Sequence, residues 1–209
     1  MMMNKTLYLL WFSDIFILTG FGLATPIMAI FIKETIFGGT VLAAGIASAL
    51  FLCVKALVQI PFSKYVDNHE DKVKWLWIGT FLIITIPIQY LLAKNVYSIY
   101  LAQVVYGIGA GIASSAWLSL WSTNLDKNHE GFEWSLYSAT VGIGTGAAAF
   151  IGGLLATYYG FNATIIIMGV LSVLGFLILL YMEHKTHGEK IDITQFHKHR
   201  KLVHNPHHR

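Results

Sequence analysis

The chain of 209 residues is poor in charge and in cysteine. Asp, Glu, Lys and Arg together make up 12% of the residues, whereas hydrophobic residues make up 56% and the mean hydropathy is +0.61. A soluble globule needs many more polar residues than this to cover its surface. The single cysteine, Cys53, excludes an internal disulfide and a cysteine-based metal cage. The composition therefore predicts an integral membrane protein surrounded by lipid.

Motifs of membrane-embedded and hydrolytic enzymes are also missing. The sequence has no HExxH metal motif, no GxSxG nucleophile motif and no pair of aspartates within its hydrophobic runs. It likewise lacks the repeated charged ring or filter-like loop that ion channels use. We therefore expect neither an enzyme nor a channel, and we expect no cofactor and no bound metal.

Long hydrophobic runs fill most of the chain. A helix of about 20 apolar residues crosses the hydrocarbon layer of a bilayer. Six such runs cover residues 7–31, 41–65, 75–93, 97–121, 133–157 and 162–182. The first run has no small-residue cleavage site after a short apolar core, so it is expected to be a retained span and not a signal peptide. Residues 1–183 are thus predicted to form an all-α membrane domain of six transmembrane helices.

Lysine residues predict the orientation, because Lys and Arg in short loops stay on the cytoplasmic side of a membrane. Most of the lysines in the predicted loops fall on one side, which carries Lys5, Lys64, Lys72, Lys74 and Lys127. The other side carries Lys33 and Lys94. This distribution predicts a multi-pass protein of the cell membrane with both termini in the cytoplasm.

The tail, residues 184–209, has a composition unlike that of the spans. It holds seven of the nine histidines, interleaved with Lys and Arg. Its low hydrophobicity predicts disorder or loose surface structure. Such a tail adheres to anionic lipid or binds metal ions, although its histidine spacing matches no defined ligand set. Nucleic-acid binding is not expected, because the rest of the chain is not basic and no stacking platform accompanies the tail.

The two halves of the predicted domain resemble each other. Spans one and four carry scattered polar residues, spans two and five are rich in small residues, and spans three and six are the most uniformly apolar. Inverted repeats of three helices are a building unit of secondary transporters. A helix that is apolar on every face suits a lipid-exposed position. The pattern predicts a bundle in which two sets of three spans form a 3+3 inverted repeat.

Three segments carry a family resemblance. The loop after span two, PFSKYVDNHEDKVKW at residues 61–75, has Asp67 followed by a basic cluster of Lys72 and Lys74. Span four contains QVVYGIGAGIASSAW, and span five with its exit contains GIGTGAAAFIGGLLATYYGF. In order and spacing these segments resemble the cytoplasmic loop motif, helix four and helix five of the major facilitator superfamily. The resemblance covers residues 5–182 and matches the amino-terminal six-helix half of such a transporter.

The resemblance implies a secondary transporter that moves a small organic solute by alternating access, with Asp67, Lys72 and Lys74 in a gating loop. The two halves of such transporters are parallel repeats, so two identical copies in one orientation would replace them. The chain is therefore predicted to work as a parallel homodimer. Two alternatives stay open: a half that pairs with a different six-helix chain, and a membrane scaffold or assembly subunit that transports nothing.

Two charged residues lie within the predicted spans. At 1.5 Å of rise per residue, Asp14 lies about 10 Å past Leu7 in span one, and Lys55 lies about 15 Å before Tyr65 in span two. The two charges should therefore lie at similar depth in neighbouring antiparallel spans. Ionisable residues inside a membrane are costly and mark solute or proton pathways. We expect Asp14 to exchange a proton, and Lys55 to pair with it or to bind an anionic substrate group. A structural salt bridge or snorkelling side chains are the alternative.

Polar and aromatic residues in spans two and four are candidates for solute binding. The family resemblance implies that helices one and four line the central cavity. A site for a small organic solute combines aromatic rings with a few placed hydroxyls and amides. The candidates are Gln59, Gln103, Tyr106 and Trp117.

Small residues in spans two and five predict an interface. Small side chains let helix backbones approach closely in a membrane. The candidates for a dimer interface are Gly45, Ser48, Gly142, Gly146 and Gly153. The resemblance implies that span two of one half meets span five of the other. Packing within one subunit is the alternative.

Overall fold

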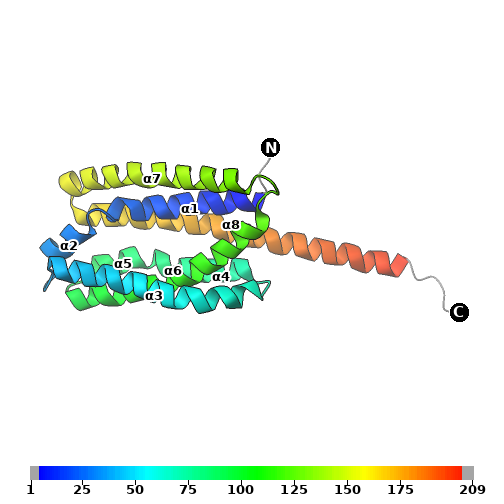
Figure 1. The fold of residues 1–209 in the computed structure, drawn as a ribbon, viewed down its shortest axis with the longest axis horizontal. Helices are drawn as coiled ribbons and strands as arrows, with labels where there is room; N and C mark the ends of the chain where they lie inside the picture. Colours follow the sequence, from blue (N-terminus) through cyan, green and yellow to red (C-terminus); the bar gives the residue numbers. More distant parts are fainter. Residues whose placement is uncertain (1–4, 204–209) are drawn as a thin grey trace.

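The computed structural model describes the backbone of residues 5–203 and the side chains of residues 6–182. Over this range the chain is helical throughout, apart from short connections (Figure 1). The helices are α1 (Lys5–Ala24), α2 (Met28–Thr35), α3 (Val41–Asp67), α4 (Lys72–Ile84), α5 (Ile86–Leu92), α6 (Val96–Asn124), α7 (Glu130–Tyr159) and α8 (Phe161–Val203). Within the described residues, six spans are long and apolar enough to cross a membrane. The predicted all-α class and its six spans are confirmed.

Two of the predicted spans are interrupted near one end of the bundle. The first was expected to run to residue 31, but α1 ends at Ala24 and a turn that contains Pro26 leads into α2. The third is broken at Thr85, between α4 and α5, two residues before Pro87. Proline has no N–H and its ring clashes with the preceding helical turn, so it favours a break at each position.

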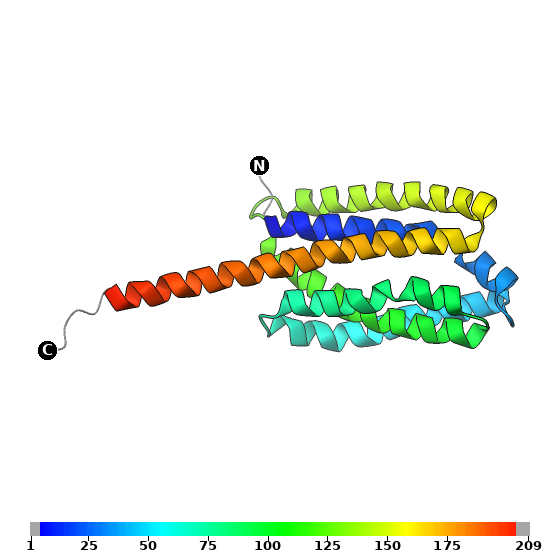
Figure 2. The same cartoon turned by 180° about the vertical axis from the view of Figure 1, so that it is seen from behind.

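The helices form two layers, which are visible from both sides of the molecule (Figures 1 and 2). In one layer α1 packs on α7 and α8, and in the other α6 packs on α3 and α4. The helix that opens each three-span repeat is therefore surrounded by the last two spans of the other repeat. This exchange confirms the 3+3 inverted-repeat bundle. It also separates α1 from α3, which were expected to be neighbours.

Glycine permits close approach of helix backbones within each layer. A Cβ atom at Gly111 of α6 would lie 2.8 Å from the Cβ of Val58 on α3, and a Cβ atom at Gly152 of α7 would clash with the backbone carbonyl of Leu23 on α1. A side chain at either position would push the two helices apart. These contacts explain why part of the small-residue pattern serves packing within the bundle.

Helices α3 and α7 are the least buried of the six spans. Only 17% of the residues in the most hydrophobic stretch of α3 are buried, and 11% of those in α7. The corresponding share in the other four spans lies between 39% and 44%. Both helices therefore lie at the edges of their layers, with one face packed on the bundle and the rest uncovered.

The backbone of α8 stays helical to Val203 and extends past the other helices at the end of the bundle where α1 begins (Figure 2). A disordered tail was expected from residue 184. The stretch from residue 183 to Val203 contains no proline that would end the helix. The side chains of this stretch and residues 204–209 lie outside the described residues, as do the predicted metal and lipid contacts of the tail.

Candidate functional site

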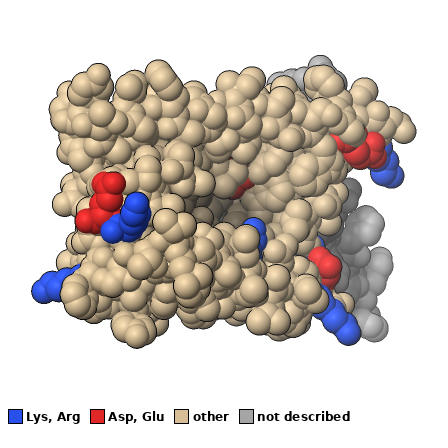
Figure 3. All heavy atoms as spheres, turned by 60° about the vertical axis from the view of Figure 1, so that its left-hand side comes forward, with Lys and Arg blue, Asp and Glu red and all other residues tan. Residues whose placement is uncertain are grey.

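A cavity of about 350 Å³ lies between the two layers. Its walls come from α1, α7 and α8 on one side and from α3, α4 and α6 on the other. Figure 3 shows a hollow in this face of the molecule, with an acidic side chain inside it and a basic side chain at its edge. A concave site of this volume with a few polar groups in an apolar wall is typical of small-molecule binding.

Helices α1, α3, α4 and α6 each line the cavity with one stripe of side chains. Residues three or four positions apart lie on the same face of a helix. The stripe of α3 consists of Phe51, Lys55 and Gln59, and α6 contributes Tyr106, Ala110, Ala113 and Trp117. Lys55 and Gln59 therefore face the cavity from one face of α3, and Tyr106 and Trp117 face it from one face of α6.

Asp14 of α1 lines the cavity and accepts a hydrogen bond from the hydroxyl of Tyr137 on α7. One turn before Asp14 on α1, Trp11 Nε1 donates to Thr140 Oγ1 of α7 at 2.8 Å. Both bonds join α1 to α7. Tyr137 was not among the predicted site residues, because nothing in a single sequence indicates that α7 packs on α1.

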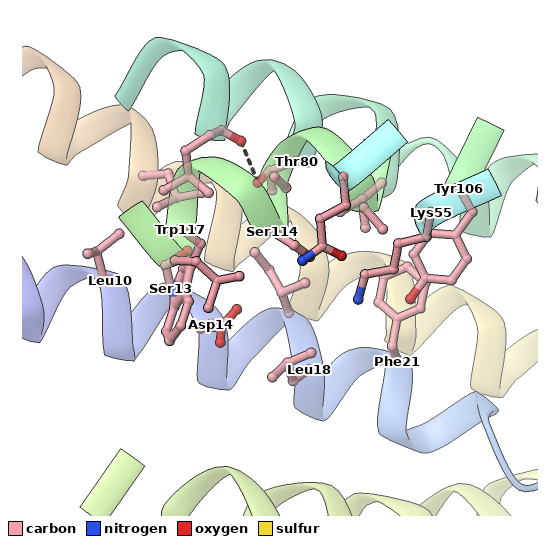
Figure 4. Close-up of a pocket in the computed structure, with 18 of the residues that line it drawn as sticks. Leu10, Ser13, Asp14, Leu18, Phe21, Lys55, Thr80, Tyr106, Ser114 and Trp117 are labelled. Carbon is pink, nitrogen blue, oxygen red and sulfur yellow. Dashed lines mark hydrogen bonds between the residues drawn. The ribbon is translucent and has the colours of Figure 1, made fainter. Parts of the chain in front are cut away.

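Lys55 of α3 faces the same cavity as Asp14 without pairing with it. Figure 4 shows both side chains pointing into the space between their helices. Among the described residues no ion pair joins the Lys55 ammonium to the Asp14 carboxylate. The predicted pair is absent because Asp14 is held on the α7 side by Tyr137, whereas Lys55 projects from the other layer.

Aromatic rings form two walls of the cavity. The ring of Tyr106 stacks between those of Phe21 on α1 and Phe51 on α3, with centroid distances of 4.8 Å and 4.2 Å. The Trp117 ring lies 4.8 Å from that of Tyr137. Tyr106 and Trp117 thus take the positions expected of cavity residues.

The two predicted glutamines differ in their placement. Gln59 lines the cavity, and its backbone carbonyl accepts a hydrogen bond from Ser115 at 3.0 Å. Gln103 is buried outside the cavity, where its Nε2 donates to Tyr90 Oη at 3.1 Å. Gln103 lies one turn before Tyr106 on α6, at the level where α5 covers the helix, so it serves packing and not the cavity wall.

Two of the three predicted gating residues are joined through α6. Lys72 Nζ donates to Ser119 Oγ at 2.8 Å, and Ser119 Oγ donates to Asp67 Oδ1 at 2.8 Å. The loop between α3 and α4 is therefore fastened to α6 at one end of the bundle. Lys74 is exposed on the surface of α4. The role of Ser119 was missed, since a serine near a helix end carries no signal of its own.

The glycines predicted to form a dimer interface are open. A Cβ atom at Gly45, Gly142, Gly146 or Gly153 would meet nothing within 4 Å, and Ser48 is exposed. Within the described residues, no close packing contact accounts for these glycines. The small-residue faces of α3 and α7 are uncovered in the described part of the chain.

Comparisons with family models and with curated proteins point to the same family. A model of the Major Facilitator Superfamily matches residues 10–206. An uncharacterized MFS-type transporter of Methanocaldococcus jannaschii is 25% identical over 198 residues, which cover 92% of this chain and 50% of the relative. A homolog of the multi-drug resistance efflux pump PmrA from Lactococcus lactis is 23% identical over 87% of this chain and 45% of its own length. The quinolone resistance protein NorA of Staphylococcus aureus is 22% identical over 87% of this chain and 46% of its own length.

Among solved structures, the POT family transporter PepTSo superposes with a TM-score of 0.76 at 13% sequence identity. The match covers 88% of this chain and 38% of that one, and it concerns the fold alone. This chain spans about half the length of the curated relatives named above. The family match extends over nearly all of the six-span, inverted-repeat bundle. The chain belongs to the Major Facilitator Superfamily.

Proposed function

We propose that the chain forms one half of a secondary transporter that moves a small organic solute by alternating access. The cavity between the layers carries this proposal, because it gathers Asp14, Lys55, Gln59, Tyr106 and Trp117 inside the membrane spans. Two of the relatives are named for multi-drug efflux and for quinolone resistance, which supports an organic solute.

The alternative function, a scaffold that transports nothing, fits the geometry less well. A scaffold would keep Asp14 and Lys55 at the membrane surface and would have no polar cavity. Instead both residues line one cavity between the two layers. Burying two charges in this way is costly for a merely structural protein, and it is typical of a solute pathway.

The second half of the transporter is, in our proposal, another copy of the chain in the same orientation. Helices α3 and α7 of one copy would meet α7 and α3 of the other. Three observations support this pairing: both helices are poorly buried, their small residues are open, and α7 has no charged residue after Glu133. A twofold axis along the membrane normal makes the two contacts identical and closes the cavity against lipid.

We further propose that Asp14 couples transport to protons. Its carboxylate faces the cavity and is held by the Tyr137 hydroxyl. In alternating access such a carboxylate takes up a proton while the cavity opens to one side and releases it on the other. Intramembrane carboxylates commonly form proton relays in transporters.

Uptake into liposomes tests the function. The purified chain is reconstituted, and uptake of radiolabelled norfloxacin, a quinolone, is followed with and without an imposed pH gradient. Wild-type protein should show saturable uptake that responds to the gradient, and Asp14→Asn should abolish that response. Glu34→Gln, which neutralises an exposed carboxylate on α2, serves as the control. Unchanged uptake and unchanged pH dependence in Asp14→Asn would rule out proton coupling through this residue.

The dimer is tested by native mass measurement in nanodiscs and by crosslinking. A mass of two chains is expected for wild-type protein, and Gly146→Leu should reduce it to one. Gly131→Leu, at an equally open position at the start of α7, should leave the dimer intact. A uniform monomer in wild-type protein would refute the homodimer. A complex with another chain would identify the alternative partner.

A further inference from the structure

Lys55 and Asp14 lie near enough for their charges to interact, but among the described residues the Lys55 ammonium has no hydrogen-bond or ion-pair partner. Lys55 is half-buried and lies within the membrane span formed by α3. Asp14, the acidic residue of the same cavity, accepts its hydrogen bond from Tyr137. In the described part of the chain, no hydrogen bond or ion pair reaches the Lys55 ammonium. A cation in the membrane interior is costly unless an opposite charge satisfies it.

The neighbours of Lys55 along α3 define the chemistry of the space in front of it. Gln59 lies one turn away on one side and brings an amide that donates hydrogen bonds. Phe51 lies one turn away on the other side, and its ring stacks on Tyr106, which stacks in turn on Phe21. Figure 4 shows the Lys55 side chain beside Tyr106.

The surroundings of Lys55 thus combine hydrogen-bond donors with an aromatic wall. A carboxylate accepts hydrogen bonds from ammonium and amide groups, and charge-assisted bonds of this kind are the strong ones. The stacked rings offer an apolar surface to a flat organic body, and offset stacking adds to the contact area. A cationic solute would meet an unfavourable charge at this place.

We propose that the transported solute is an organic anion with an aromatic body, whose carboxylate is bound by Lys55 with the help of Gln59. This inference deepens the proposed transport function and uses the same cavity. Asp14 and Lys55 then have separate tasks, since one handles the proton and the other the solute. Lys55 is a specificity-determining residue in this assignment, because it contacts the solute directly.

Equilibrium binding to the purified full chain tests the proposal without transport. The probes are 2-naphthoate and its neutral amide, 2-naphthamide, titrated by isothermal calorimetry in detergent. Wild-type protein should bind the carboxylate about tenfold or more tightly than the amide, as the loss of one charge-assisted bond predicts. Lys55→Met should remove this preference and leave the affinity for the amide unchanged. Lys55→Arg should retain the preference.

Lys64→Met is the matched control, because Lys64 is an exposed lysine of the same helix and does not line the cavity. It should bind 2-naphthoate as wild-type protein does. Equal binding of acid and amide by wild-type protein would overturn the proposal, and so would an unchanged preference in Lys55→Met. The wild-type comparison decides the matter even if Lys55→Met fails to fold. Absence of uptake in the liposome assay, together with Lys55-dependent binding of 2-naphthoate, would count against the transport function and leave the anion site standing.

Discussion

At the residue scale, the hydrogen bond between Tyr137 and Asp14 is the contact that ties the cavity to α7. Tyr137→Phe removes the hydroxyl and leaves the Asp14 carboxylate without its donor. We expect the variant to be less stable by about 1 to 3 kcal/mol, since a hydrogen bond to a charged group contributes roughly this much. Thermal unfolding in detergent measures the effect.

The control for this change is Tyr158→Phe, which removes a hydroxyl from an exposed tyrosine of the same helix. It should unfold at the wild-type temperature. If both variants unfold together with wild-type protein, the bond to Asp14 does not stabilise the fold.

Ser119 is a second residue whose single hydroxyl joins two elements. Ser119→Ala removes the links to Lys72 and to Asp67 together. We expect backbone amides in the loop between α3 and α4 to exchange hydrogen roughly three- to tenfold faster, as the loss of a surface hydrogen bond predicts. Mass-spectrometric hydrogen exchange on the reconstituted protein measures this. Ser135→Ala, which loses only a bond to its own helix, should leave the loop unchanged.

The sequence alone pointed to the charged residues of the cavity, but it did not indicate their hydrogen-bond partners. Asp14 and Lys55 stand out because charges are rare in membrane spans, and the structure places both in one cavity. Their partners depend on which helices meet. Tyr137 was therefore missed, because it binds Asp14 from a distant span, and the amide of Gln103 donates to Tyr90 outside the cavity.

At the scale of elements, two adjacent glycines of α7 differ in their surroundings: one packs tightly against α1 and the other is open. A Cβ at Gly152 clashes with the Leu23 carbonyl of α1, whereas a Cβ at Gly153 meets nothing. We expect Gly152→Ala to lower the unfolding temperature and the yield of folded protein, because α7 must move away from α1. Gly153→Ala should leave both near the wild-type values.

Size-exclusion chromatography with thermal unfolding compares the two glycine variants. Equal loss of stability in both would mean that the whole small-residue stripe of α7 is covered. That result would contradict the uncovered face on which the proposed dimer depends. The two substitutions add the same methyl group to adjacent positions of one helix, so intrinsic helix propensity cancels in the comparison.

Hydrophobic runs were enough to place all six spans, because length and apolarity are strict requirements of the bilayer. The breaks before α2 and α5 were not foreseen. Pro26 and Pro87 lie at these breaks, but Pro61 lies inside α3 without ending it. Whether a proline ends a membrane helix depends on which neighbouring groups satisfy the freed carbonyl, and this requires the packed structure.

At the scale of the whole molecule, the distribution of lysine predicts how the bundle sits in the membrane. In a Cys53→Ser background, Lys94→Cys in the loop between α5 and α6 should react with an impermeant maleimide in intact cells. Lys127→Cys in the loop between α6 and α7 should react only after permeabilisation. Both lysines are exposed in the structure, so labelling reports sidedness. The reverse pattern would place the termini outside.

The repeated order of polar, small-residue and apolar spans predicted the inverted repeat. What it did not indicate is that each repeat exchanges its first helix with the other. Uniform apolarity pointed to spans three and six as the lipid-exposed ones, yet α3 and α7 are the least buried in the structure. Composition carries no information about which helix lies beside which, so the pairing of α1 with α7 and α8 could not be predicted either.

Because α1 packs on helices that are made much later, its polar residues wait for their partners during synthesis on the ribosome. Ser13 Oγ donates to the carbonyl of Gly175 at 2.9 Å, across 162 positions of the chain. Helix α1 is made before α7 and α8, yet Trp11, Ser13 and Asp14 find their hydrogen-bond partners on those two later helices. Until then Ser13 and Asp14 must be sheltered by the insertion machinery or by lipid headgroups, because hydrocarbon leaves them unsatisfied. The layer of α1, α7 and α8 therefore closes only after α8 has been made.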